Sequence, residues 1–388
     1  MRKRTKGILI LFFICSLTVT LTTSATAITA QKFITAYDFS DADIPFISSH
    51  FEVIDTYASK EKQVQAIKNA NPLIKAIFYK DALTHQQWDA PEDWYVHDAH
   101  TGSRLVNKDW GWYLMDIGNP AYRASLAEFI KNNLANNPVF DGVFLDDVWG
   151  SVSSDRFYKK GAKEKGVVPP SNISTFHNNI MELLKEIKSS MGSKILIINT
   201  GDTNKDYLAV ADGQMDEAFC HAKWQKFEKY YSTWQRHLNN MIKASESGKI
   251  YLAQSGIAYG ATESEIKKTA RYCFAMFLLG ANNNSYFYFA FQQRYEGVTY
   301  FPEWEVDLGS SIENYHARAE SPLYEREYSK GLVIINPSAE SFQIKLGEKY
   351  KNLDGVVTDT ITLGTHEGEI LLKIPPAYPT VLRDITTP

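Results

Sequence analysis

The segment FDGVFLDDVW at residues 140–149 decides the fold predicted for this chain. Its apolar residues are consecutive, a pattern typical of a strand buried on both faces of a parallel sheet. Two adjacent carboxylates, Asp146 and Asp147, end the run. Side chains alternate along a strand, so the two cannot both point inward while the strand continues. The segment therefore predicts a buried strand with one carboxylate facing a pocket. The alternative is that both carboxylates only cap the following segment.

Seven further segments are short, rich in β-branched and aromatic residues, and mostly apolar on both faces. They are residues 33–39, 51–57, 73–79, 194–199, 214–219, 249–254 and 285–289. Between these segments, apolar residues recur at helical spacing in residues 60–70, 121–135, 174–190, 222–246 and 262–279. Eight such units over roughly 290 residues predict a (β/α)8 TIM barrel. An open doubly wound sheet is the alternative, but it usually carries a glycine-rich turn after its first strand, and residues 37–40 contain no glycine.

The C-terminal part of the chain has a different pattern. Short strand-like segments separated by turn residues occupy 330–335, 341–346, 356–359, 369–374 and 380–382, and no stretch of helical length interrupts them. We therefore expect a barrel over residues 31–322 and a small antiparallel β-sandwich domain over residues 323–388.

The N-terminal residues have the pattern of a secretory signal. Four basic residues within positions 2–6 precede an apolar run at 8–21, and the small-residue sequence ATA follows at 25–27. Residues 1–27 are therefore expected to direct the protein to a secreted or extracytoplasmic location. An uncleaved membrane anchor stays open as an alternative, although the apolar run is short for a membrane span.

Charge and composition argue against several classes of protein. Removing residues 1–27 takes away four basic and no acidic side chains, so the net charge of −4 becomes −8. An acidic chain offers no basic surface for nucleic acid, and 44% hydrophobic residues with 13% aromatics exclude disorder. Cys220 and Cys273 remain after the signal. We expect two buried thiols rather than a disulfide, because the sequence alone does not place the two residues close together.

In a TIM barrel the active site lies at the C-terminal ends of the strands, where this chain supplies carboxylates, amides and aromatic rings. Asp146 and Glu217 are the predicted catalytic residues, because cleavage of a glycosidic bond needs two carboxyl groups. The apolar neighbours of Glu217 are expected to raise its pKa and keep it protonated as an acid. Alternatively, Glu217 pairs with Lys223 or His221 at the rim of the barrel.

A wider set of residues at the predicted strand ends and in the aromatic loop at 80–120 could bind a sugar through hydroxyl groups or ring faces. The predicted substrate-binding residues are Asp38, Tyr57, Tyr79, Trp110, Trp112, Asp116, Asp147, Trp149, Asn199, Trp224, Gln254 and Tyr288. For each tryptophan, plain packing is the alternative. For Asp116, the alternative is that it only fixes the start of the next helix.

Other chemistries have weaker support in the sequence. His97, Asp98 and His100 are close together, but no further ligands follow at the spacing of a metal site. The chain has no G-x-S-x-G motif and no P-loop. We therefore expect no metal and no organic cofactor.

The run DGVFLDDVWG at 141–150, together with MDIGNPAYR at 115–123, resembles the hypothetical glycosyl hydrolase family numbered fifteen. More distantly, the chain resembles barrel glycosidases of the α-amylase and dextranase type. This likeness implies a catalytic nucleophile at Asp146 and a general acid at Glu217. The chain lacks the histidine-containing strand motifs and an evident calcium loop of α-amylases, which puts an α-glucan substrate in doubt.

Together these features predict a secreted, monomeric glycoside hydrolase that acts on a polysaccharide or oligosaccharide. A separation of about 5–5.5 Å between the two carboxyl groups would predict retention of anomeric configuration, and about 6.5–9.5 Å would predict inversion. The alternatives are a carbohydrate-binding barrel without catalysis, or another exported polysaccharide-active enzyme such as a deacetylase or lyase.

Overall fold

The computed structural model describes residues 30–86, 89–152, 154–161, 164–201, 203–222, 233–258, 260–290 and 297–375. Eight parallel strands close into a barrel with the neighbour order β1-β12-β11-β10-β9-β7-β3-β2. The ring closes where Gln31 of β1 pairs with Tyr286 of β12. The strands are β1 (Gln31–Thr35), β2 (Val53–Thr56), β3 (Lys75–Asp81), β7 (Gly142–Asp146), β9 (Ile195–Asn199), β10 (Gly213–Asp216), β11 (Ile250–Gly256) and β12 (Ser285–Ala290). The predicted TIM barrel is confirmed.

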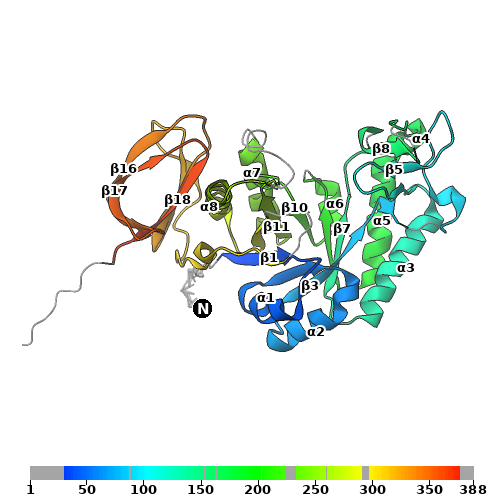
Figure 1. Cartoon of the computed structure of the whole chain (residues 1–388), viewed down its shortest axis with the longest axis horizontal. Helices are drawn as coiled ribbons and strands as arrows, with labels where there is room; N and C mark the ends of the chain where they lie inside the picture. The colour runs from blue at the N-terminus through cyan, green and yellow to red at the C-terminus, as the bar shows by residue number, and fades with distance from the viewer. Residues whose placement is uncertain are drawn as a thin grey trace, which may run out of the picture.

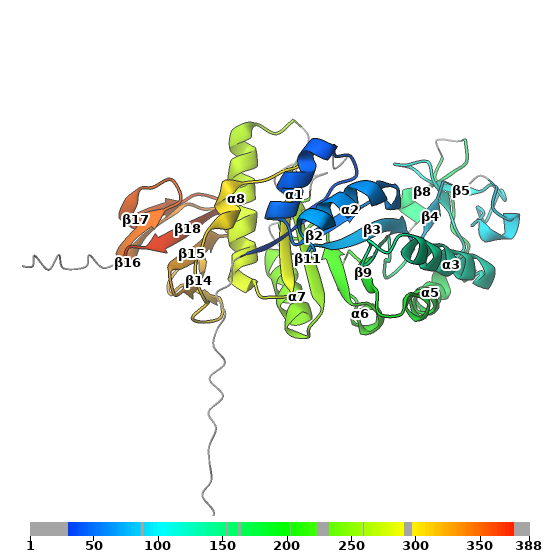
Figure 2. The same ribbon diagram turned by 90° about the horizontal axis from the view of Figure 1, so that it is seen from below.

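Helices surround this barrel on its outer side (Figures 1 and 2). They are α1 (Ile44–His50), α2 (Glu61–Ala70), α3 (Pro120–Asn136), α5 (Phe176–Met191), α6 (Lys205–Val210), α7 (Trp234–Glu246) and α8 (Glu263–Gly280). The short α4 (Pro170–Ser174) precedes α5 and lies at the same end of the molecule as β8 (Phe157–Lys159) (Figure 1). Local sequence explains where two of them begin. The Asn119 side chain accepts hydrogen bonds from the first-turn amides of α3, and Thr262 and Glu265 form a capping box at the start of α8.

The loop region at 80–120 contributes a small sheet rather than an irregular rim. Strands β4 (Thr84–His85), β5 (Leu105–Asn107) and β6 (Tyr113–Leu114) combine with β8 (Phe157–Lys159) in the order β4-β6-β5-β8. These strands are too short to produce a readable periodicity in the sequence. The sheet lies at the end of the molecule opposite the C-terminal domain (Figure 1).

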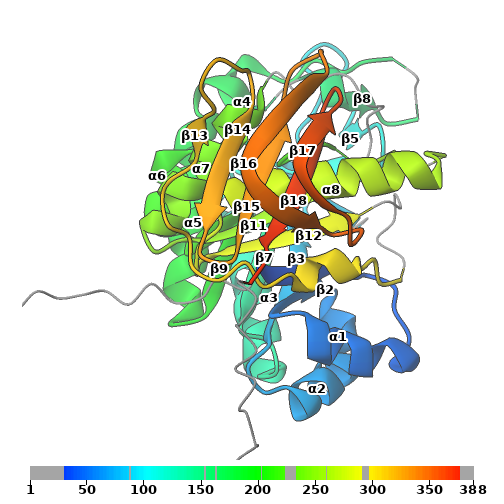
Figure 3. The same ribbon diagram turned by 90° about the vertical axis from the view of Figure 1, so that its left-hand side faces the viewer.

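The C-terminal domain is an antiparallel sheet of six strands in the order β13-β14-β15-β18-β16-β17. Its strands are β13 (His316–Ala317), β14 (Tyr324–Tyr328), β15 (Gly331–Asn336), β16 (Phe342–Asn352), β17 (Val357–Leu363) and β18 (Glu367–Lys373). Helix α8 lies between this sheet and the barrel strands (Figures 2 and 3). The buried Arg326 of β14 donates hydrogen bonds to the carbonyl oxygens of Leu278 and Ala281 at the end of α8. The domain is therefore fixed to the barrel by polar contacts as well as by apolar packing.

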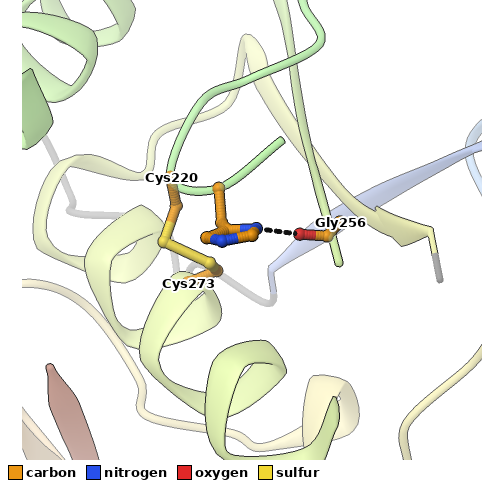
Figure 4. The surroundings of a disulfide bond; sticks show 4 residues. Cys220, Gly256 and Cys273 are labelled. Atoms are coloured by element: carbon orange, nitrogen blue, oxygen red, sulfur yellow. Dashed lines mark hydrogen bonds between the residues drawn. A yellow bond between two sulfur atoms is a disulfide. The ribbon is translucent and has the colours of Figure 1, made fainter. Parts of the chain in front are cut away.

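Cys220 and Cys273 form a disulfide, so the prediction of two buried thiols is wrong (Figure 4). Their Cα atoms lie 5.3 Å apart although 53 residues separate them in the chain. Cys220 follows β10 and Cys273 lies on α8, so the packing of two distant elements brings them together. Beside the disulfide, the His221 ring Nδ1 is 2.7 Å from the carbonyl oxygen of Gly256.

Within the described ranges, no helix combines the length and apolar character needed to cross a lipid bilayer. The predicted signal at residues 1–27 lies outside these ranges.

Candidate active site

Three neighbouring strands bring Asp146, Asn199 and Glu217 together at the C-terminal end of the barrel. Asp146 ends β7, Asn199 ends β9, and Glu217 follows β10 directly. The Asn199 side-chain amide donates to Asp146 Oδ1 at 2.9 Å and to Glu217 Oε2 at 3.0 Å. These two carboxyl oxygens therefore lie no more than about 6 Å apart, because each is a hydrogen-bond length from one nitrogen atom. The two predicted catalytic residues share one site.

Two more donors fix the Asp146 carboxylate. The Tyr79 hydroxyl donates to Oδ2 at 3.2 Å, and the backbone N–H of Asp147 donates to Oδ1 at 2.7 Å. Asp147 has a φ angle of 57°, in the left-handed region that Asp and Asn adopt more readily than most residues. This turn ends the strand, so the adjacent carboxylates take different environments, as the alternation argument requires.

Burial and like charge shift the pKa values of this carboxylate cluster upward. Burial, followed by the nearby Glu217, raises the pKa of Asp146 to about 7. Burial also raises the pKa of Asp147 well above its usual range. Burial raises the pKa of Asp55, on strand β2, well above its usual range. The nearby charges of Asp146 and Glu217 raise this pKa further. Carboxyl groups this close together do not all ionise at neutral pH.

An aromatic cluster adjoins Asp146 on the side of β1, β2 and β3. Tyr37 and Tyr57 stack with ring centroids 4.5 Å apart, and Tyr79 meets the Tyr37 ring edge-on at 5.3 Å. Asp55 accepts a hydrogen bond of 2.9 Å from the Tyr37 hydroxyl, which fixes the orientation of that ring. Tyr57 is 41% exposed.

A cavity of about 750 Å³ opens on the other side, over β9 and β10. Asp147, Asn199 and Glu217 line its floor. Trp149 and Arg156 line one wall, and the Arg156 guanidinium lies 4.2 Å from the Trp149 ring centroid. This cation–π contact stiffens a wall that combines an apolar ring with hydrogen-bond donors.

Several predicted substrate-binding residues lie away from this site. Gln254 is fully buried inside the barrel, where it accepts a hydrogen bond from Thr35, and Tyr288 is 2% exposed and packs against Phe33. Asp38 is exposed on the rim, 3.9 Å from the ammonium group of Lys60.

Other predicted residues belong to the loops. Asp116 accepts hydrogen bonds from the Gly118 amide and the Asn172 side chain, which matches the alternative that it organises the start of a helix. Trp110 is 64% exposed and tilts against Trp112 in the loop between β5 and β6, and neither is among the residues that line the cavity. Trp224 lies outside the described residues.

Sequence reasoning missed most of the cavity residues, including the charged or ionisable Arg156, Arg236 and His237. Arg156 ends a short 3-10 helix (Ser154–Arg156) between β7 and β8, and the other two lie in the first turn of α7. No motif marks them, because a histidine or arginine at a helix start is ordinary in sequence.

The candidate metal ligands have other partners. His97 bonds to Glu92, and Asp98 accepts hydrogen bonds from Val167 and Thr101. In the part of the chain that the structure describes, no group of three or more His, Cys, Asp or Glu side chains is arranged to hold a metal ion.

Comparisons with known proteins point to one family. The sequence matches hypothetical glycosyl hydrolase family 15 over residues 68–332. No curated protein sequence matches the chain. Among solved structures, the maltogenic α-amylase AmyB from Thermotoga neapolitana is 10% identical with a TM-score of 0.52, covering 89% of this chain and 98% of its own. An α-amylase from Lactobacillus plantarum is 11% identical with a TM-score of 0.52, covering 89% and 99%.

A third similar structure is the glycoside hydrolase domain of PelA from Pseudomonas aeruginosa, which is 15% identical with a TM-score of 0.46. It covers 72% of this chain and 97% of that domain. At these identities, the two amylases support the barrel fold alone.

Proposed function

Because this chain belongs to hypothetical glycosyl hydrolase family 15, we propose that it is a glycoside hydrolase that cleaves a polysaccharide or oligosaccharide with Asp146 and Glu217. The observation that carries the proposal is the Asn199 amide that bonds both carboxyl groups. A glycosidase needs two carboxyl groups on either side of one glycosidic bond, and this bridge sets their separation.

The separation favours retention of configuration. The bridged oxygens are at most about 6 Å apart, below the roughly 6.5–9.5 Å that leaves room for a water molecule in inverting enzymes. In the first step, the Asp146 carboxylate attacks the anomeric carbon. The bond from that carbon to the leaving oxygen breaks, and the leaving oxygen takes the proton of Glu217. In the second step, Glu217 removes a proton from water, which displaces Asp146 and regenerates both groups.

Asp146 must be ionised to attack. The Asn199, Tyr79 and Asp147 donors all stabilise the ionised form, whereas burial opposes it. These donors compensate for the lost solvation of the carboxylate and hold it in one orientation.

The test is a reducing-sugar screen over bacterial and plant polysaccharides with the wild type, Asp146→Asn and Glu217→Gln. Both variants should lose at least a thousandfold in kcat on the polysaccharide that the wild type cleaves, with circular dichroism spectra like the wild type. The matched control is Glu128→Gln, a change at an exposed position on the outer helix α3. Cleavage by either site variant at the rate of this control would contradict the assignment.

We also propose that the protein is exported as a monomer to an oxidising compartment. The signal pattern of residues 1–27 supports export, and the Cys220–Cys273 disulfide supports an oxidising environment. Intact mass spectrometry of the protein from its native host should show a chain that begins near residue 28. Light scattering should give the mass of one chain.

A further inference from the structure

Behind Glu217, a buried hydrogen-bond network reaches the wall of the cavity. Asp216, the last residue of β10, is 3% exposed and lines the same cavity as Glu217. Its Oδ2 atom accepts hydrogen bonds from His237 Nδ1 at 2.6 Å and from the Tyr251 hydroxyl at 2.9 Å. Its Oδ1 atom accepts from the Ala218 amide at 3.1 Å. These bonds fix the position of the imidazole ring.

The network also fixes how the imidazole ring can bond. The Asp216 carboxylate accepts from Nδ1, and Nε2 faces the guanidinium group of Arg236, which can only donate, so in this arrangement Nδ1 donates and Nε2 accepts. The Arg236 guanidinium lies 3.4 Å from this Nε2 atom. Arg236 and His237 both line the cavity of about 750 Å³. One wall of the cavity therefore carries the exposed Arg236, whose guanidinium group contacts the buried, oriented imidazole of His237.

The position of this wall relative to the catalytic pair indicates which part of a substrate it meets. Along the barrel, Asp146, Asn199 and Glu217 follow one another on β7, β9 and β10, and α7 lies beyond β10. The tyrosine cluster lies on the opposite side of Asp146. A general acid stands next to the oxygen that leaves, so the released part of the substrate lies on the Glu217 side.

We propose that this cavity is the leaving-group subsite, in which Arg236, positioned by His237, hydrogen-bonds the hydroxyl groups of the sugar chain that is released. The inference rests on the proposed function and deepens it. The cavity volume of about 750 Å³ is within the roughly 300–1,000 Å³ of pockets that enclose drug-sized ligands, which is more than a small aglycone needs. The substrate therefore carries a carbohydrate chain, rather than a small aglycone, on its leaving side. The sugar that reacts with Asp146 lies toward Tyr57.

The experiment compares two substrates built from the polysaccharide found in the screen. One is the polysaccharide itself, and the other is its oligosaccharide with dinitrophenol at the reducing end, whose leaving group has no sugar hydroxyl to bond Arg236. In His237→Ala, the ratio of kcat/KM for the polymer to kcat/KM for the dinitrophenyl substrate should fall at least tenfold, mainly through KM for the polymer. Arg236→Met, a change at an exposed cavity residue, should lower the same ratio without affecting folding. His316→Ala, in the C-terminal sheet, is the matched control and should leave both values unchanged.

Asp216→Asn adds a readout that a loss of stability would not produce. An asparagine amide that donates to Nδ1 moves the ring proton to Nε2, so polymer binding should weaken while the protein stays folded. Calorimetry with the oligosaccharide in a Glu217→Gln background should show weaker binding on adding either Asp216→Asn or His237→Ala. An unchanged substrate ratio in both His237→Ala and Arg236→Met would overturn this inference alone. A wild type that cleaves no polysaccharide would overturn the proposed function and this inference together.

Discussion

At the level of single residues, Asn199 holds the carboxyl groups of Asp146 and Glu217 close together. Two carboxyl groups within about 6 Å repel each other when both are ionised. The neutral Asn199 amide donates a hydrogen bond to each carboxyl group and so holds both in place. It adds no positive charge that would form an ion pair with one of the two. The effect of the repulsion is visible at Asp146, where burial and then a charged Glu217 raise the pKa, so the two carboxyl groups share one proton, which lies on Glu217 in the reactive state proposed above.

This electrostatic coupling can be measured without a substrate. In Glu217→Gln, the neutral amide no longer opposes ionisation of its neighbour, so the pKa of Asp146 should fall below its wild-type value of about 7. Carbon-13 NMR titration of labelled aspartate side chains reports this pKa directly. The same titration of Glu128→Gln should match the wild type. An Asp146 pKa that stays the same or rises in Glu217→Gln would show that the two groups do not interact.

At the level of elements, the segment after β10 is held from two sides. The Phe219 amide donates to the Gln254 carbonyl, and the Gly256 amide donates to the His221 carbonyl, so the chain continues alongside β11 beyond its last strand residue. Cys220 then ties the segment to α8. Glu217 therefore lies between the buried Asp216 network and a covalent link.

The disulfide should contribute to stability mainly by restricting the unfolded chain. For a separation of 53 residues, the loop-closure relation gives about 4 kcal/mol. Replacing both Cys220 and Cys273 by serine should lower the free energy of unfolding by about that amount in urea denaturation. Reduction of the wild type should produce a similar loss, and the double variant should not respond to the reductant. Equal denaturation midpoints for oxidised and reduced wild type would contradict this account.

At the level of the whole molecule, the barrel could be predicted because its strands are buried on both faces. Segments such as residues 140–146 and 285–289 carry apolar side chains on both faces, and a strand of a parallel sheet covered on both sides buries all of them. The proximity of Asp146 and Glu217 could be predicted for a related reason, since both come where such segments end and strand ends converge in a barrel.

The positions of the other residues depend on how deep each side chain lies in the barrel and on contacts between elements that are distant in the chain. The sequence pattern shows neither. Gln254 and Tyr288 each lie two residues before the end of their strand, which places them one layer below the barrel mouth. Cys220 and Cys273 meet only because β10 and α8 pack together. Arg236 and His237 reach the cavity from a helix start, through contacts that only the folded chain creates.

The central claim is that Asp146 and Glu217 act as a retaining pair across one glycosidic bond. Proton NMR of the reaction, recorded during the first turnovers before mutarotation, gives the anomeric configuration of the newly formed reducing end. The bridge through Asn199 predicts that this product has the same configuration as the bond that was cut. A first product of the opposite configuration would contradict it.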